Sequence, residues 1–387
     1  AICHTAAKNG IQSALMAPTE ILAEQHFRSF AELLEPCGIR VGLLTGSMTA
    51  SQKRNIRELA ALGMVDVLIG THALISDGVE FASLGLVITD EQHRFGVNQR
   101  GALAAKGKNP HVLVMSATPI PRTLALIIYG DLDISVLDEM PKGRVPVSTY
   151  FVDGGKRERA YNFVRKHVAD GFQGYVICPL VEEGENSGDL KAARDYAESL
   201  SEGYLKGCRV GLLHGRMKGG EKDAVMQAFA SGELDVLVST TVVEVGVNVP
   251  NAVIMVIENA ERFGLSQLHQ LRGRVGRGSV QSYCILISDA KNEAAVGRLN
   301  IMCRTTDGFE IANEDLKQRG PGDFFGSRQH GLPDMKIADM MTDMQIFSSA
   351  QQAAQEILRR DPGLTLPGHQ GLSREVSVLF DSERAMN

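Results

Sequence analysis

The sequence has no closely spaced pair of cysteines. Its six cysteines lie far apart, and none belongs to a CxxC motif or to a short secreted framework: Cys3, Cys37, Cys178, Cys208, Cys284 and Cys303. Structural zinc sites and disulfide scaffolds are built from such pairs or clusters. The pattern therefore argues against both, and it favours the reducing cytoplasm as the compartment of the protein.

The sequence also lacks an apolar run long enough to cross a membrane. Its most apolar segment, residues 112–128, is interrupted by Ser116, two prolines and Arg122, which a bilayer core penalises. We therefore expect no membrane span. No signal peptide opens the chain, and its first residue is Ala rather than Met, so we expect a piece of a longer protein.

The sequence also lacks an excess of basic over acidic residues. The 46 Asp and Glu residues outnumber the 40 Lys and Arg residues, which gives a net charge of −6. A polyanion such as a nucleic acid is usually met by a basic surface, so any site for one must be a local patch. The 387 residues, 44% of them hydrophobic, are enough for two or three globular domains.

Two segments of the chain resemble each other. Residues 40–71 align without a gap with residues 209–240, and both begin Arg-Val-Gly-Leu-Leu. Each copy reads as a strand, a Gly-containing turn, an amphipathic helix that ends at Gly63 or Gly232, and a second strand that opens with Asp-Val-Leu. An ungapped match of this length predicts two similar α/β domains in tandem.

The remaining apolar segments fit parallel sheets. Six short runs, apolar on both faces and separated by helical stretches, begin at residues 12, 85, 111, 174, 252 and 282. The Pro- and Gly-containing segment 138–148 is the expected interdomain linker. We predict an α/β fold with a first domain over residues 1–142, a second over 143–290 and a mostly helical C-terminal appendage over 291–387.

Polar side chains follow several strands of the first predicted sheet. Asp90 and Glu91 come directly after one strand, Ser116 after another, and Thr19 and Thr71 after two more. Ligands bind at the carboxyl ends of the strands in open parallel sheets. Taken singly, each residue could be a helix cap or a solvated turn. Four such turns on one sheet favour a binding site.

The second half carries a cluster of arginines. Arg272, Arg274 and Arg277 lie within six residues and alternate with glycines, which let a backbone come close to a ligand. Guanidinium groups bind phosphate bidentately and stay charged. With carboxylates for a metal and a water in one domain and arginines in the other, the pattern predicts a nucleoside triphosphate site between the two sheets.

The motifs resemble those of superfamily-two helicases and, within them, the RecG helicase family. "DEQHRFGVNQR" (residues 90–100) and "SATPIPRTLAL" (116–126) are similar to the second and third motifs, and "APTEILAEQH" (17–26) and "GTHAL" (70–74) to the first-domain DNA-contact motifs. "TTVVEVGVNVPNA" (240–252) and "QLRGRVGRG" (270–278) resemble the fifth and sixth. Residues 308–331 resemble the translocation segment that the family shares with the coupling factor Mfd. The resemblance implies two RecA-like domains.

The resemblance also implies roles at an ATP site. Asp90 would hold Mg²⁺ on the β- and γ-phosphates, and Glu91 would orient and deprotonate the attacking water. Arg274 and Arg277 would be arginine fingers that reach the γ-phosphate. The residues that would bind ATP beside them, or link its hydrolysis to DNA, are His93, Ser116, Thr118, Gly246 and Gln270.

For DNA, the resemblance implies contacts that sense no base identity. Four threonines at strand ends or helix starts would bind backbone phosphates: Thr19, Thr71, Thr240 and Thr241. Arg298, Arg319 and Gln329 match residues of the translocation segment that couple motor closure to pulling duplex. The substrate implied is branched DNA, as at stalled forks and Holliday junctions, and we expect a monomer that acts in recombination and repair.

One expected motif is missing. A search for GxxxxGK[ST], the pattern of a phosphate-binding loop, finds no match. The opening "AICHTAAKNG" reads as the end of a helix stopped by Gly10, and in the resembled family that helix starts at the phosphate loop. We therefore expect the intact protein to be an ATPase, whereas these residues alone would bind ATP weakly and hydrolyse it poorly.

Several alternatives stay open. Mfd-type translocases need a large domain after the translocation segment, and only about 55 residues follow Gly331. PriA-type helicases carry paired zinc cysteines, which are absent. A nucleic-acid-binding module without ATPase activity remains a different class of function. A dinucleotide-binding oxidoreductase would need a GxGxxG motif opening a helix after a strand, and the sequence has none.

Overall fold

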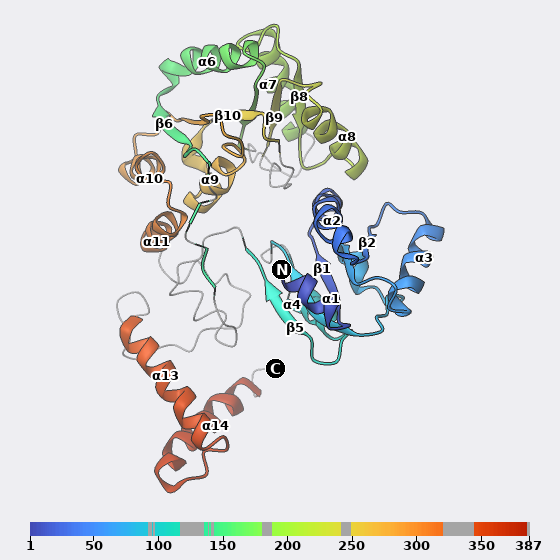
Figure 1. Cartoon of the computed structure of the whole chain (residues 1–387). Coiled ribbons are helices and arrows are strands. Elements are labelled where there is room, and N and C mark those ends of the chain that lie inside the picture. Colours follow the sequence, from blue (N-terminus) through green and yellow to red (C-terminus); the bar gives the residue numbers. More distant parts are fainter. Residues whose placement is uncertain are drawn as a thin grey trace. The chain divides into compact units, whose positions relative to one another are not determined.

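The structure is a computed structural model of the chain. It describes residues 1–91, 95, 97–116, 135–137, 139–140, 143–179, 188–240, 249–319 and 344–384. The chain divides into two compact units (Figure 1), one made of residues 1–119 and 137–312 and the other of residues 120–136 and 313–387. The first unit contains both sheets, and the second is helical where it is described.

The first sheet has five parallel strands in the order β2-β3-β1-β4-β5. Their bounds are β1 Gln12–Met16, β2 Val41–Leu44, β3 Val67–Gly70, β4 Leu84–Thr89 and β5 His111–Val114. Its helices are α1 Ile2–Lys8, α2 Glu20–Leu34, η1 Glu35–Cys37, α3 Ala50–Ala61, η2 His72–Ile75 and α4 Val97–Ala104. Because every strand is parallel, all carboxyl ends lie along one edge of the sheet.

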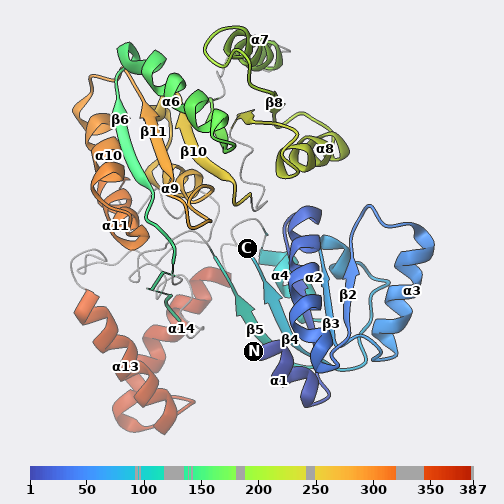
Figure 2. The ribbon, with the colours of Figure 1, turned by 45° about the horizontal axis from the view of Figure 1, so that its top comes forward.

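The second sheet has six parallel strands in the order β6-β11-β10-β7-β9-β8 (Figure 2). Their bounds are β6 Ser148–Val152, β7 Gln173–Ile177, β8 Val210–Leu213, β9 Val236–Ser239, β10 Ala252–Ile257 and β11 Tyr283–Ile287. The accompanying helices are η4 Gly154–Lys156, α6 Arg157–Ala169, α7 Gly188–Glu202, α8 Gly219–Ala230, η6 Ala260–Arg262, α9 Leu265–Arg272 and α10 Glu293–Arg304.

Each sheet is covered by side chains on both faces, since alternate residues of a strand point to opposite sides. In β1, Leu15 belongs to a core cluster that includes residues of α1 and α2, and Met16 to one that includes residues of α3 and η2. In β10, Ile254 packs with residues of α6 and α7, and Met255 with residues of α8, α9 and α10. The predicted α/β class with two parallel sheets is confirmed.

The internal repeat is confirmed as a repeated strand-helix-strand unit. In the first copy it is β2-α3-β3 and in the second β8-α8-β9, with matching pairing of Val41 to Val67 and of Val210 to Val236. The glycines predicted to end the two helices, Gly63 and Gly232, have φ angles of 69° and 80°. Residues that carry a side chain rarely adopt this left-handed backbone conformation, so glycine suits both positions.

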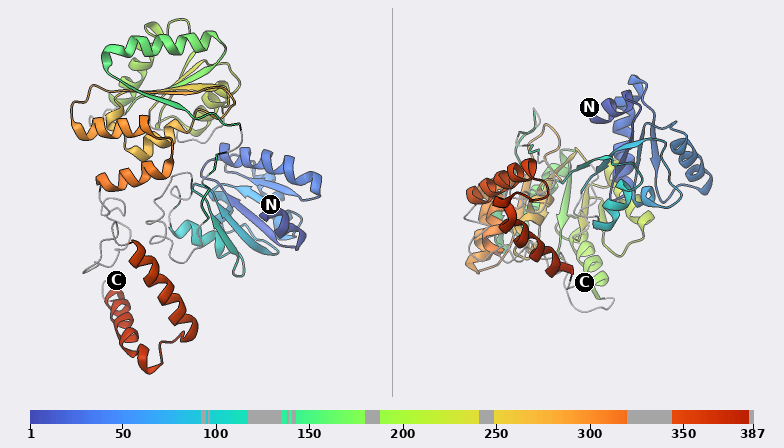
Figure 3. Two further views of the ribbon diagram at one scale, coloured as in Figure 1. Left: turned by 60° about the vertical axis from the view of Figure 1, so that its left-hand side comes forward. Right: turned by 90° about the horizontal axis from the view of Figure 1, so that it is seen from below.

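The C-terminal region is helical where it is described (Figure 3). It consists of α11 Gly308–Arg319, α13 Met344–Arg360, η7 Pro367–His369 and α14 Gln370–Arg384. The turn between α13 and α14 is organised by Asp361, which accepts hydrogen bonds from the backbone N–H groups of Thr365 and Leu366 and hydrogen-bonds to His369. Among the helices that the structure describes, none is both long and apolar enough to cross a membrane.

Two strand predictions need correction. The first sheet was expected to be apolar and buried on both faces, but β5 is an edge strand and its Val112 and Leu113 are 45% and 37% exposed. The chain after the expected linker was given no strand, yet β6 pairs with β11 from Ser148 onward. Its sequence, Ser-Thr-Tyr-Phe-Val, carries two polar residues and was therefore harder to detect than a continuous apolar run.

Candidate functional site

Asp90 lies directly at the carboxyl end of β4. Its backbone N–H donates to the carbonyl of Met16 at 3.0 Å, which continues the pairing of β4 with β1 by one residue. Its carboxylate Oδ1 accepts a hydrogen bond from the N–H of Glu91 at 2.9 Å. The side chain is only 20% exposed. The strand therefore delivers a partly buried carboxylate to the edge of the sheet where ligands bind.

Glu91 has an unusual backbone conformation. Its φ is 50°, in the left-handed region that residues other than glycine, asparagine and aspartate seldom adopt. Such conformations cost about 1–3 kcal/mol and cluster at functional sites, where the surrounding structure holds them. The hydrogen bond from Glu91 N–H to the carboxylate of Asp90 is one of the contacts that hold this one. The sharp turn at Glu91 therefore begins directly after Asp90.

His26 completes this corner, and the sequence reasoning did not select it. Its Nε2 lies 2.8 Å from Oδ2 of Asp90, so the imidazole and the carboxylate are hydrogen-bonded. His26 is on α2, about two helical turns after Thr19, within the segment "APTEILAEQH". That spacing puts Thr19 and His26 on one side of α2, which is the signal that could have identified His26.

Arg272 does not join the expected phosphate-binding cluster. It is 3% exposed, and its Nη1 donates to the carbonyls of Met302 and Thr305 at 2.9 and 2.8 Å. Those carbonyls belong to the last turn of α10, where a cation is favoured by unsatisfied carbonyls and by the helix dipole. The sequence grouped Arg272 with arginines expected to bind phosphate, but this side chain instead connects α9 to α10.

His269 is largely buried next to Arg272. Its Nδ1 lies 3.1 Å from Nη2 of Arg272. Burial, followed by the nearby charge of Arg272, lowers the pKa of His269 to about 4. The imidazole is therefore neutral at physiological pH and accepts the hydrogen bond from the guanidinium.

Arg274 and Arg277 follow α9 in the loop where the sequence places them. Burial, and then the charge of Arg274, lowers the pKa of Arg277, while the carboxylate of Glu91 acts in the opposite direction and raises it. Both guanidinium groups also act on the buried phenol of Tyr175 in β7, whose pKa desolvation raises to about 12. The two arginines thus form a local concentration of positive charge beside β7.

One glycine of the arginine loop has a structural explanation that needs no ligand. Gly276 has a φ of 73°, and a Cβ at this position would lie 2.5 Å from Cγ2 of Val147. Its carbonyl accepts a hydrogen bond from Nε of Arg144 at 2.8 Å. Glycine is required here because the backbone is left-handed and a neighbouring segment fills the space.

The threonines of the predicted DNA contacts differ in their surroundings. Thr19 is an N-cap of α2, and its hydroxyl accepts a hydrogen bond from Leu22 N–H at 3.3 Å. Thr71 and Thr240 occupy equivalent positions of the repeat, and each is 2% exposed. Among the described residues, neither hydroxyl has a hydrogen-bond partner, which is uncommon for buried polar groups. Their contact with DNA stays a prediction.

Of the predicted translocation residues, Arg298 is fully described. It lies on α10, and its Nη2 donates to the carbonyl of Glu261 in η6 at 3.1 Å. Arg319 is the last residue of α11. The roles predicted for Ser116, which follows β5, and for Gln270 in α9 stay predictions. The remaining predicted site residues lie outside the described part of the chain: His93, Thr118, Thr241, Gly246 and Gln329.

The donor set at β4 fits a magnesium ion that is bound mainly by a nucleotide. Among the described residues, no group of three or more His, Cys, Asp or Glu side chains could hold a metal by itself. Mg²⁺ commonly keeps several waters and is bound by one or two carboxylates together with substrate phosphates. The partly exposed carboxylate of Asp90 meets that requirement.

Comparisons with known proteins agree with the motifs. The family profile "DEAD/DEAH box helicase" matches residues 1–127, and "Helicase conserved C-terminal domain" matches residues 156–279. A third profile, "ATP-dependent DNA helicase RecG, domain 3, C-terminal", matches residues 305–381. The three matches together cover the first sheet, strands β7 to β10 of the second sheet and residues 305–381 of the helical C-terminal region.

Curated relatives extend the similarity over nearly the whole chain. The ATP-dependent DNA helicase RecG of Bacillus subtilis is 50% identical over 383 residues, which are 98% of this chain and 56% of the relative. The RecG helicase of Streptococcus pneumoniae is 53% identical over 348 residues, 90% of this chain and 51% of the relative. The chain thus spans about half the length of the curated relatives it matches.

Solved structures show the same similarity. A structure of RecG bound to a three-way DNA junction is 49% identical and has a TM-score of 0.72, covering 87% of this chain and 43% of that one. Dbp5 of S. cerevisiae bound to RNA and ADP BeF3 is 16% identical with a TM-score of 0.54, covering 90% and 81%. At that identity the second similarity shows only the shared fold, two RecA-like domains in tandem.

Proposed function

Because the chain belongs to the RecG family of ATP-dependent DNA helicases, we propose that it is the motor region of an ATP-driven DNA helicase that remodels branched DNA. Its relatives are named as helicases, and one of them has been seen on a three-way junction. The proposal extends both properties, ATP-dependent movement and DNA as the partner, to this chain. Stalled forks and Holliday junctions are the branched structures that we expect it to act on.

The observation that carries the proposal is the corner formed by Asp90 and Glu91 at the end of β4. The backbone of Glu91 is left-handed and its N–H donates to the carboxylate of Asp90, so two acidic residues follow β4 in a sharp, hydrogen-bonded turn. Phosphoryl transfer to water needs an acidic residue for the metal and another group that orients the water. Arg274 and Arg277 supply a concentration of positive charge, and the effect of Glu91 on the pKa of Arg277 supports a shared site.

We assign the following roles at this site. Glu91 orients and deprotonates the attacking water, while Arg274 and Arg277 stabilise the charge that develops on the γ-phosphate. Asp90 would hold Mg²⁺, which neutralises phosphate charge when it is bound. His26 positions Asp90 through the hydrogen bond to Oδ2, since a fixed carboxylate orientation favours metal binding.

DNA is bound through its backbone in this proposal. Thr19, Thr71, Thr240 and Thr241 contact phosphates, and Arg298, Arg319 and Gln329 couple nucleotide-dependent closure to movement along duplex. The buried hydroxyls of Thr71 and Thr240, which have no partner among the described residues, support such contacts only if local movement exposes them. We further propose that the protein acts as a monomer in the cytoplasm.

These 387 residues alone form an incomplete ATP site in this proposal. They contain no GxxxxGK[ST] motif, so a backbone cradle and a lysine for the β- and γ-phosphates are missing from them. We therefore propose weak ATP binding and poor hydrolysis by this chain on its own. Full turnover by the purified 387 residues would contradict this part of the proposal.

The test is the substitution Glu91→Gln in the full-length protein. The amide keeps the size of the side chain but cannot take a proton, so DNA-stimulated ATP hydrolysis should fall by roughly 10²- to 10⁴-fold. Binding of ATP, measured with a fluorescent analogue, should change less than about twofold because Glu91 acts on the water. Persisting hydrolysis would remove Glu91 as the base, and loss of nucleotide binding would assign it a different role.

A further inference from the structure

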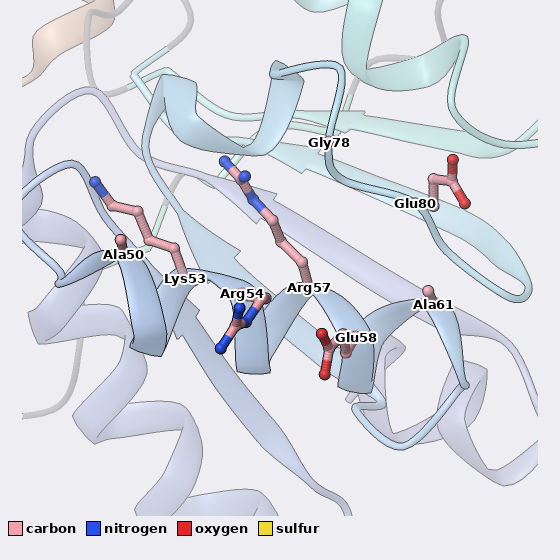
Figure 4. A pocket seen from close by; sticks show the side chains of 8 residues that line it. All are labelled: Ala50, Lys53, Arg54, Arg57, Glu58, Ala61, Gly78 and Glu80. Carbon is pink, nitrogen blue, oxygen red and sulfur yellow. The ribbon is translucent and has the colours of Figure 1, made fainter.

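Helix α3 of the first domain has a basic face that the activity proposed above does not use. Lys53, Arg54 and Arg57 line a hollow of about 510 Å³ together with residues of the loop after η2, among them Gly78 and Glu80 (Figure 4). In the figure, Lys53 and Arg57 both extend from α3 toward the side on which this loop lies. Three cations on little more than one turn of a helix repel each other, so their presence needs a reason.

Lys53 is explained by the fold alone. Its Nζ donates to the carbonyl of Gly46 in the turn before α3. The equivalent Lys222 of the second copy donates in the same way to Gly215 at 2.6 Å. Both lysines therefore close the same strand-to-helix turn.

Arg54 and Arg57 have no such equivalent. Their places in α8 are taken by Asp223 and by the buried Met226. Since α8 packs in the same topology without arginine at either position, the fold does not require the two guanidinium groups. What distinguishes the two copies at this helix is positive charge.

The two arginines are also incompletely used within the described part of the chain. Arg54 is exposed and has neither a hydrogen bond nor an ion pair with any other described residue. Arg57 donates from Nη2 to Oγ of Ser76 at 3.2 Å, and its guanidinium lies against Gly78, where a Cβ would be 3.1 Å from Nη1. Nε of Arg57 is buried and has no partner among the described residues. Guanidinium groups held in this way retain donors for an oxyanion.

We propose that this hollow, formed by α3 and the loop of residues 76–80, binds backbone phosphates of duplex DNA. It adjoins η2, which begins directly after Thr71, a residue assigned above to DNA contact, and Arg57 touches Ser76 at the end of η2. This inference rests on the proposed function and adds a contact to it. Phosphate contacts of arginine position a duplex and carry no base specificity.

The acidic residues of the hollow favour a polymer over a small anion. Glu58 and Glu80 line it too, so its formal charge is only one unit positive. A free phosphate would gain little binding energy from so small a net charge. DNA that the motor already holds presents its phosphates at a high effective concentration, and a weak contact then adds to the total affinity.

The test compares two double substitutions in the 387-residue chain. Arg54→Gln with Arg57→Met places neutral side chains at the two positions, and the second copy shows that Met is compatible with the helix at the latter. Arg165→Gln with Lys166→Gln removes the same charge from the exposed face of α6 in the second domain. Binding of a fluorescent 30-base-pair duplex is followed by anisotropy between 50 and 200 mM salt.

We expect only the α3 variant to change. Losing two phosphate contacts should reduce the slope of log K against log salt by about 1.8 and weaken binding on the order of tenfold at the lowest salt. Arg54→Gln alone, at a side chain without contacts, should reduce the slope by about 0.9 without lowering the melting temperature. The α6 variant should keep the slope of the unsubstituted chain.

Four results would overturn the inference. If both double variants weaken binding equally, only general charge matters. If the unsubstituted chain and the α3 variant bind duplex DNA with the same affinity, the hollow makes no contact with DNA. The proposed DNA-binding function then still stands. If inorganic phosphate competes more strongly than chloride at equal ionic strength, and only with the α3 arginines present, the site belongs to a small anion. If the unsubstituted chain does not bind duplex DNA at all, the proposed function is wrong as well.

Discussion

The two sheets repeat each other strand by strand. The order β2-β3-β1-β4-β5 of the first corresponds to β8-β9-β7-β10-β11 of the second, which adds β6 at the outer edge of β11. Among the described residues, no strand lies beyond β5 in the first sheet. Val112 and Leu113 of β5 are exposed, whereas residues 284–287 of the corresponding strand β11 are buried.

The repetition extends to individual hydrogen bonds that organise the backbone. Arg40 pairs with Asp66, and Arg209 pairs with Asp235 in the same geometry. A glutamine at the start of the central strand donates to two carbonyls in each copy, Gln12 in the first and Gln173 in the second.

The copies differ in the side chains that we propose to bind a ligand. The first has carboxylates at the end of β4, and the second has arginines after α9. The comparison shows that contacts to main-chain groups were kept in both copies while the residues at strand ends diverged. It also gives each prediction below a control within the same molecule.

The largest effect is expected at Arg272, which connects α9 to α10 in the second half of the chain. Arg272→Leu should lower the free energy of unfolding of the second sheet by about 3 kcal/mol, since buried carbonyls of Met302 and Thr305 lose their donor. Hydrogen exchange read by mass spectrometry would localise the loss to α9 and α10. Arg159→Leu, at an exposed position of α6, should be nearly neutral. Equal costs would mean that Arg272 is not a structural link.

An intermediate effect is expected at the matched glutamines. Gln12→Leu should cost about 2 kcal/mol, because the carbonyls of Ala60 and Val65 lose their shared donor. Gln173→Leu should cost a similar amount through Phe229 and Leu234. Exchange rates should rise in the first sheet only for the former variant and in the second only for the latter. A difference above about 1 kcal/mol would show that the two positions are not equivalent.

The smallest effect is expected from the matched ion pairs, and it depends on pH. The hydrogen bond from Arg40 lowers the pKa of Asp66, and that from Arg209 lowers the pKa of Asp235. A depressed carboxyl pKa contributes stability above the unfolded value of about 4, and this is lost as the pH falls through the folded pKa. Asp66→Asn and Asp235→Asn should therefore destabilise at pH 7 and converge with the unsubstituted chain in acid.

Thermal unfolding of both variants at pH 7 and at pH 2 to 3 would check this expectation. Exposed pairs are weakened by salt, so the difference at pH 7 should shrink as ionic strength rises. A deficit that stays constant from neutral to acidic pH would mean that the carboxylates stabilise by packing and not by charge.

Much of the fold could be predicted because the deciding signals are local in sequence. Continuous apolar runs bounded by turns predicted β1, β4 and β10, and the repeat predicted β2-α3-β3 and β8-α8-β9 together. The edge strand β6 was missed because its two polar residues, Ser148 and Thr149, shorten the apolar run. The interactions of Arg272 could not be read from its motif, since its partners lie about thirty residues further along the chain.

The sequence by itself determined the fold class, the duplication and which residue types stand at the ends of the strands. These follow from hydrophobic periodicity and from motifs, both of which act over a few residues. The tertiary structure decided how similar side chains are used. It buried Arg272 under α10, joined His26 to Asp90, turned the backbone left-handed at Glu91 and left Arg54 in solvent. Burial and hydrogen bonding depend on partners distant in the chain, so the spacing of residues cannot specify them.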